Sequence, residues 1–83
     1  MLIDGFDEVL EGLSAIESDT TIPKNVRAKV KNAMVILNDE QEKNLAIRID
    51  RSLQELGDVA EDPNIPPHTR MQIWSVVSRL ESK

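Results

Sequence analysis

Apolar residues recur along this chain with the i, i+3, i+4, i+7 spacing that lines one face of an α-helix. Four stretches show the pattern: about Leu2 to Ser18, Pro23 to Asn38, Asp39 or Glu42 to Glu61, and Pro66 to Glu81. Their predicted core positions are Leu2, Ile3, Phe6, Val9, Leu10, Leu13 and Ile16, then Val26, Val30, Ala33, Met34 and Leu37, then Leu45, Ile49, Leu53, Leu56 and Ala60, and finally Ile73, Val76, Val77 and Leu80. No useful length alternates with period two, so we predict four helices and no β-sheet.

Proline marks two of the three connections, in Thr20-Thr21-Ile22-Pro23 and Asn64-Ile65-Pro66-Pro67. Proline is tolerated at a helix start because its missing N–H has no intrahelical partner there. The isoleucine before each proline is pushed out of the helical region, which separates the flanking helices. At the remaining connection, Asp39 followed by Glu42 has the spacing of a capping box and predicts a helix start.

The two halves of the chain, residues 1–40 and 44–83, align without a gap at an offset of 43 residues. Both carry the turn pattern D-x-x-I-P-x-x-x-R, formed by Asp19, Pro23, Arg27, Asp62, Pro66 and Arg70. We interpret the chain as two tandem helical hairpins and these residues as structural. Each aspartate is expected to accept backbone N–H groups near the next helix, and each arginine to reach back toward its aspartate.

The turn residues are similar to those of HEAT repeats, whose hairpins also carry Asp, Pro and then Arg, and the period lies in the range of that class. Two such units do not make a stable solenoid. We therefore predict an all-α fold with one domain over residues 1–83, in which the hairpins close on each other as a four-helix bundle.

Nearly the whole chain resembles an uncharacterised family of small archaeal helical proteins of unknown function. The residues that carry the resemblance are Asp19 to Pro23 with Arg27, and Asp62 to Pro66 with His68, Arg70, Ile73 and Trp74. The resemblance implies an up-and-down four-helix bundle. It implies no activity, because none is assigned to the family.

Composition removes several classes of function. The chain has 83 residues, no cysteine and a net charge of −5. Without cysteine there is no disulfide framework, thiolate zinc site or cysteine nucleophile. The longest apolar run, Ala33 to Leu37, is too short to cross a membrane, and the acidic first residues do not form a signal peptide. We expect a cytoplasmic protein.

His68 is the single histidine, and we predict no catalytic, cofactor or metal role for it. A metal would need the remaining ligands from carboxylates alone. The di-iron bundle pattern needs a glutamate three residues before the histidine, where Ile65 stands. The six serines are scattered, so a serine–histidine pair is not indicated. We therefore predict that the protein is not an enzyme and has no cofactor or small-molecule substrate.

Charge is segregated along the chain. The second predicted helix holds Lys24, Arg27, Lys29 and Lys31 and no acid, whereas residues 1–23 hold six acids and no base. The favoured interpretation is pairing between these segments inside the molecule. The alternative is a basic face for RNA or an acidic partner, although no aromatic side chains are interleaved with these bases.

Some apolar residues lie off the predicted core faces, namely Val35, Ile36, Ile47, Met71 and Trp74. They indicate either a protein interface or a core face wider than assumed. A chain this short also gains stability from a partner surface. We predict a structural or interaction module that forms a homodimer or docks on a protein partner. The alternative is an accessory subunit of a ribonucleoprotein assembly.

Overall fold

The protein is described here by a computed structural model, which defines residues 6–82. They form four α-helices, and no strand occurs among them. The helices are α1 (Phe6–Glu17), α2 (Lys24–Leu37), α3 (Leu45–Ala60) and α4 (Pro67–Glu81). The predicted all-α class is confirmed. The first five residues of the predicted first helix, with Leu2 and Ile3, lie outside the described part of the chain.

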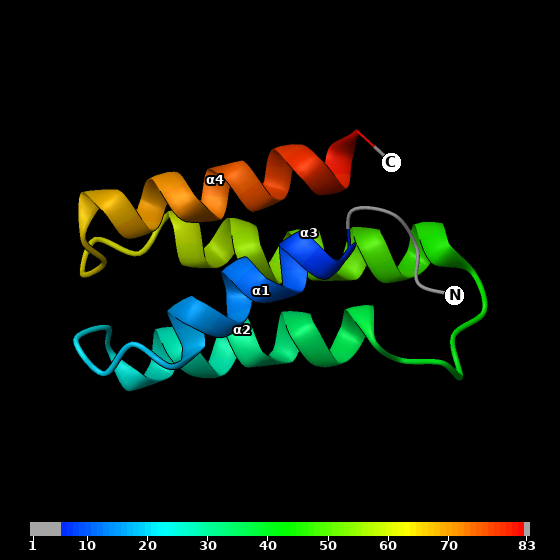
Figure 1. The fold of residues 1–83 in the computed structure, drawn as a ribbon, viewed down its shortest axis with the longest axis horizontal. Helices are drawn as coiled ribbons and strands as arrows, with labels where there is room; N and C mark the ends of the chain where they lie inside the picture. The colour runs from blue at the N-terminus through cyan, green and yellow to red at the C-terminus, as the bar shows by residue number, and fades with distance from the viewer. Residues whose placement is uncertain (1–5, 83) are drawn as a thin grey trace.

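Successive helices run antiparallel and form an up-and-down four-helix bundle of 34 × 21 × 20 Å (Figure 1). Each helix packs against its neighbours in the chain, and α4 closes the ring against α1. The diagonal pairs α1–α3 and α2–α4 have no close backbone approach within residues 6–82. The connections α1–α2 and α3–α4 lie at one end of the bundle, and the connection α2–α3 lies at the other (Figure 1).

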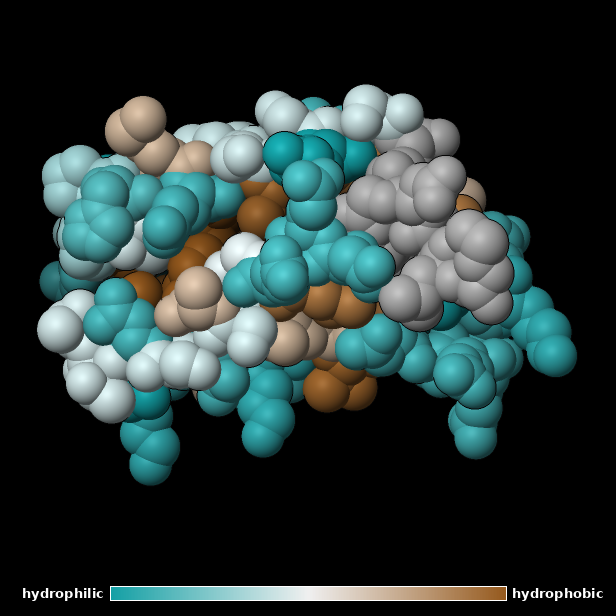
Figure 2. Space-filling model, in the orientation of Figure 1, coloured by the Kyte–Doolittle hydropathy of each residue, from teal (hydrophilic) through white to brown (hydrophobic). Residues whose placement is uncertain are grey.

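The core is a single cluster of side chains from all four helices and from the two isoleucines that precede proline. Its members are Val9, Leu13, Ile16, Ile22, Val26, Val30, Ala33, Leu37, Leu56, Val59, Ala60, Ile65, Ile73, Val76, Val77 and Leu80. On the side where α1 faces the viewer, hydrophilic side chains cover most of the surface and apolar atoms show in the furrows between them (Figure 2). Ser52 and Thr69 are the polar residues buried within this part of the chain.

Helix starts follow the proline signals closely. Pro23 and Pro66 occupy the N-cap positions of α2 and α4, with extended backbone that ends the preceding turn. The predicted start of α3 at Asp39 or Glu42 is wrong, because α3 begins at Leu45. Asn44 is its N-cap, and its side chain accepts a hydrogen bond from the backbone N–H of Ala46 at 3.0 Å.

Candidate docking site

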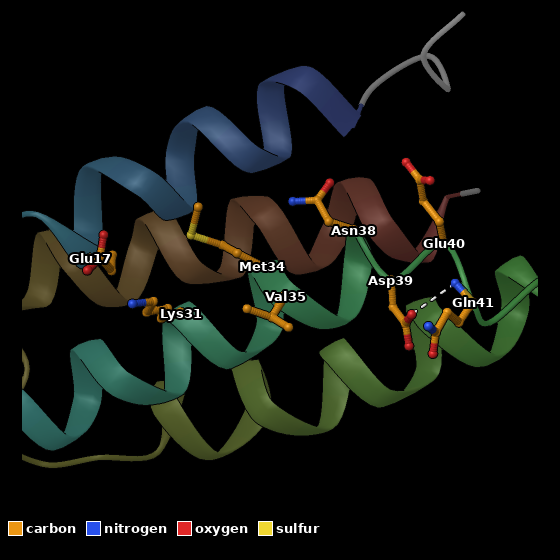
Figure 3. A pocket seen from close by; sticks show the side chains of 8 residues that line it. All are labelled: Glu17, Lys31, Met34, Val35, Asn38, Asp39, Glu40 and Gln41. Atoms are coloured by element: carbon orange, nitrogen blue, oxygen red, sulfur yellow. Dashed lines mark hydrogen bonds between the residues drawn. The ribbon is translucent and has the colours of Figure 1, made fainter.

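Two hollows on the described part of the surface differ in the residues that line them. The first lies between α1 and α2 and measures about 670 Å³, and six of its eight lining residues are polar or charged. It is lined by Glu17, Lys31, Met34, Val35, Asn38, Asp39, Glu40 and Gln41 (Figure 3). Asp39 is held at its rim by a 3.0 Å hydrogen bond from the backbone N–H of Gln41. Because Lys31 shares this hollow with several acids, its lining resembles an ordinary solvated surface.

The second hollow lies between α3 and α4, measures about 520 Å³ and is mostly apolar. It is lined by Leu45, Ala46, Ile49, Asp50, Leu53, Leu80 and Glu81. Leu45, Ile49 and Leu53 pack against the core yet remain only partly buried. Leucine and isoleucine side chains left partly in water on neighbouring positions of one helix are typical of a surface that another apolar element covers.

Gly57 and Trp74 lie further along α3 and α4, beyond the residues that line this hollow. On α3, Gly57 follows Leu53 by four residues and so lies on the same stripe of the helix. A Cβ added at Gly57 would meet no atom within 4 Å, so the surface there is open. Trp74 is 51% exposed and Met71, three residues before it, is 72% exposed. They lie on the stripe of α4 that continues from Glu81.

The contacts of Arg70 and Arg79 show which side of α4 faces α3 and which side faces α1. Arg70, four residues before Trp74, donates hydrogen bonds to the carbonyl oxygens of Ala60 and Asp62, beside α3. The opposite side of α4 faces α1, where Arg79 pairs with Glu8 at 2.8 Å. Trp74 therefore lies on the α3 side of its helix. We name the strip from Leu45, Ile49, Leu53 and Gly57 on α3 to Met71, Trp74 and Glu81 on α4 the α3–α4 face.

The structure does not gather the five off-face apolar residues into one surface. Val35 is 59% exposed and lies in the polar hollow between α1 and α2. Ile36 is half-buried on α2, and Ile47 is 37% exposed on α3. Met71 and Trp74 lie on α4, which does not approach α2 within the described residues. None of the five lines the apolar hollow between α3 and α4, although Trp74 lies on the α3 side of the helix that borders it.

The four bases of α2 do not share a face either. Arg27 is turned inward, and its Nε donates a 3.1 Å hydrogen bond to the carbonyl oxygen of Ile22. Lys29 points toward α3, where its Nζ lies 3.8 Å from Asp58. Lys31 faces α1 in the polar hollow, and Lys24 is exposed at the start of the helix. The bases are thus divided among different sides of α2.

The repeated turn residues form local hydrogen bonds rather than a reactive site. Oδ1 of Asp19 accepts from the backbone N–H and the hydroxyl of Thr21, at 2.9 and 2.6 Å, and Oδ1 of Asp62 accepts from the N–H of Asn64 at 2.8 Å. The bonds from Thr21, together with the nearby charge of His68, lower the pKa of Asp19. The paired arginines bond to backbone carbonyls, not to the aspartate carboxylates that the sequence suggested.

His68 is exposed in the first turn of α4. Within residues 6–82, no group of three or more histidine, aspartate or glutamate side chains is placed to hold a metal ion. Among the helices of this same stretch, none is long and apolar enough to span a bilayer.

Sequence reasoning missed most of the α3–α4 face. It placed Leu45, Ile49 and Leu53 in the core, because they continue the core stripe of α3. The sequence does hold one sign that this stripe of α3 faces outward. Its next member after Leu53 is Gly57, whereas a stripe that faces the core would normally carry a larger side chain there.

Comparisons with known proteins find relatives over most of this chain. A protein of Methanosarcina mazei is 43% identical over 75 residues, covering 90% of this chain and 80% of its own length. One of Thermoplasma volcanium is 38% identical, covering 93% and 85%. Both are named only as UPF0147 proteins.

Two crystal structures are also similar to this chain. An unknown-function protein, MMP1188, superposes with a TM-score of 0.87 at 43% identity, covering 93% of this chain and 86% of that one. A UPF0147 protein from Thermoplasma acidophilum has a TM-score of 0.86 at 36% identity, covering 93% and 89%. The model of the uncharacterised protein family UPF0147 matches residues 3–82, so the expected resemblance is confirmed and the chain belongs to this family of archaeal proteins of unknown function.

Proposed function

We propose that this protein is a non-enzymatic docking module whose α3–α4 face binds an apolar element of another protein. The observation that carries the proposal is the exposure of Trp74 and Met71, both at least half exposed, on the helix that also borders the apolar hollow. Tryptophan offers a large apolar surface with one polar N–H, and it is enriched among residues that dominate binding energy.

The face also has the size of a binding strip rather than of a single exposed side chain. From Leu45 to Gly57, α3 rises about 18 Å at about 1.5 Å per residue. That length matches roughly three turns of a partner helix, which would contact it through residues at i, i+3, i+4 and i+7. The half-buried side chains of Ile49 and Leu53 would be covered by such a helix.

The proposal is tested by the native size of the protein in fresh extract of its source cells. We expect the wild-type chain to elute in an assembly larger than the free chain, before and after nuclease treatment. Trp74→Asp is expected to elute as free protein, because it places an unpaired charge within the apolar contact. Val35→Asp is the matched control, since it introduces the same charge at a similarly exposed position in the other hollow.

A second variant separates loss of binding from loss of folding. Gly57→Gln replaces a helical glycine with a better helix former, so it should not lower stability. Its side chain would project into the open space at Gly57 and should block docking. An assembly that persists in both Trp74→Asp and Gly57→Gln contradicts the proposal. So does a wild-type chain that elutes free.

The same experiment decides the ribonucleoprotein alternative. An assembly that collapses on nuclease treatment and weakens steeply with added salt would favour nucleic acid over protein docking. The division of Lys24, Arg27, Lys29 and Lys31 among different sides of α2 gives that alternative little geometric support. Homodimer formation is measured separately, by sedimentation of the purified chain.

A further inference from the structure

We propose that the partner of the α3–α4 face is an amphipathic helix whose apolar stripe is flanked by lysine or arginine. This inference rests on the proposed docking function and adds the chemistry of the partner. It starts from the charges on the face, where Asp50 and Glu81 line the apolar hollow.

The arginines of α3 and α4 do not offset these acids, because each is turned elsewhere. Arg48 bonds to the carbonyl oxygen of Leu37 beside α2, and Arg70 closes the connection between α3 and α4. Arg79 pairs with Glu8 on the α1 side. Arg51 precedes Asp58 by seven residues and so shares its stripe, which faces Lys29 of α2.

The flanks of the face are also acidic. Glu61 is exposed just beyond the end of α3, and the connection before α3 holds Lys43 together with Glu40 and Glu42. A partner whose own flanks are acidic would place like charges together along the rim, which costs binding energy and slows association. A basic flank would meet Asp50 and Glu81 favourably on both sides of the apolar contact.

The same argument disfavours a symmetric dimer through this face. In such a dimer, Asp50 and Glu81 of one copy would approach the acids of the other. The chain carries a net charge of −5, so long-range repulsion acts in the same direction. The occupant that fits is a different, basic helix.

The test uses two synthetic helical peptides with the same leucine stripe, one flanked by lysine and the other by glutamate. Trp74 is the only tryptophan and the chain has no tyrosine, so its fluorescence reports directly on the face. We expect the lysine peptide to shift Trp74 emission to the blue and to bind at least about tenfold tighter than the glutamate peptide at low salt.

Two double variants separate local from overall charge. Asp50→Lys with Glu81→Lys should reverse the preference between the peptides. Asp7→Lys with Glu11→Lys changes the net charge equally on exposed positions of α1, which does not approach α3, and should leave the order of affinities unchanged.

Three outcomes overturn the inference. Equal binding of the two peptides removes the charge preference and leaves docking intact. Reversal by the α1 double variant would assign the preference to net charge alone. Failure of the lysine peptide to bind at up to about 1 mM removes the basic helix as occupant. The docking proposal is then decided independently by the elution of Trp74→Asp.

Discussion

The guanidinium of Arg48 donates a hydrogen bond from Nη1 to the carbonyl oxygen of Leu37, 3.0 Å away across the connection between α2 and α3. Leu37 is the last residue of α2, and the final carbonyls of a helix have no intrahelical partner. Arg48 therefore supplies a donor where the helix leaves an acceptor open, and it ties the start of α3 to the end of α2.

The other two connections use the same combination of residues. Arg27 bonds to the carbonyl of Ile22, and Arg70 bonds to the carbonyls of Ala60 and Asp62. Each connection also contains an aspartate that accepts from the backbone N–H two residues later: Asp19, Asp39 and Asp62. The arrangement thus recurs at every helix connection, whereas the sequence comparison found it clearly only in the two D-x-x-I-P turns. Duplication of the hairpin remains a prediction.

Arg70→Met should lower the free energy of unfolding by about 2 kcal/mol, because it removes two charge-assisted bonds to part-buried carbonyls. Arg70→Lys should recover only part of this loss, since an ammonium group lacks the planar fork that reaches both carbonyls. Urea denaturation measures the change. Arg51→Met, at an exposed position of α3, is the control and should change stability by less than about 0.5 kcal/mol. Equal losses in Arg70→Met and Arg51→Met would refute the role of these bonds.

Thr69→Val should stabilise the protein. The hydroxyl of Thr69 is buried and meets no hydrogen-bond partner within the described residues. A buried hydroxyl without a partner costs about 1–3 kcal/mol, and valine has nearly the same shape. The equivalent position of the first hairpin, 43 residues earlier, already carries the buried valine Val26.

For Thr69→Val we expect a gain of about 1 kcal/mol, which corresponds to roughly 4–8 °C in Tm for a domain of this size. Thr20→Val, at an exposed position, controls for the general effect of replacing threonine by valine and should leave Tm nearly unchanged. A fall in Tm for Thr69→Val would show that the hydroxyl finds a partner in solution.

The sequence predicted the helices well where proline limits the backbone. Pro23 and Pro66 determine where α2 and α4 begin, and the structure places both at N-cap positions. The prediction from Asp39 and Glu42 that α3 begins there is wrong, because both carboxylates bind backbone N–H groups inside the connection. Asp39 accepts from the N–H of Gln41 and Glu42 accepts from the N–H of Asn44, and neither opens the helix.

The surface was harder to predict than the helices. Helical periodicity gives the direction of a side chain around its own axis, but it does not say which neighbour lies in that direction. Val35 and Trp74 look equivalent by this measure, yet Val35 lines a hollow among mostly polar residues between α1 and α2, whereas Trp74 lies on the side of α4 that faces α3. Helical periodicity also fails to predict that Ser52 is buried. Its hydroxyl is satisfied within α3 by the carbonyl of Ile49 at 2.9 Å, so a polar residue fits the core.

Thr21→Val should raise the pKa of Asp19 toward its ordinary value, because the bond from the Thr21 hydroxyl is the largest cause of the lowered pKa. The backbone N–H bond survives this change, so the rise is partial. Titration of the Asp19 carboxyl carbon by NMR measures it. Thr20→Val should leave the pKa of Asp19 unchanged, and a similar rise in both variants would contradict the assignment.

The lowered pKa of Asp19 also predicts a pH dependence of stability. Because the folded pKa lies below that of the unfolded chain, the ionised carboxylate stabilises the fold above the unfolded value, about pH 4. This stabilisation is lost as the pH falls through the folded pKa. Thr21→Val should therefore lose less stability than wild type between neutral and acidic pH, as measured by urea denaturation at each pH. An unchanged slope would remove Asp19 as a contributor.

Gly57→Ala should raise stability more than Gly12→Ala, although both glycines lie inside helices. Alanine restricts the unfolded chain and favours helix, for a gain of about 0.5–1 kcal/mol where the new methyl has room. At Gly57 no atom lies within 4 Å of the added Cβ, whereas at Gly12 it meets Cγ2 of Val76 at 3.4 Å. The methyl at Gly12 would sit at the near limit of ordinary van der Waals contact with α4, so it has less room than at Gly57 and the gain should be smaller. Thermal denaturation of the two variants decides the order, and an equal or larger gain at Gly12 would show that α1 and α4 have room to separate.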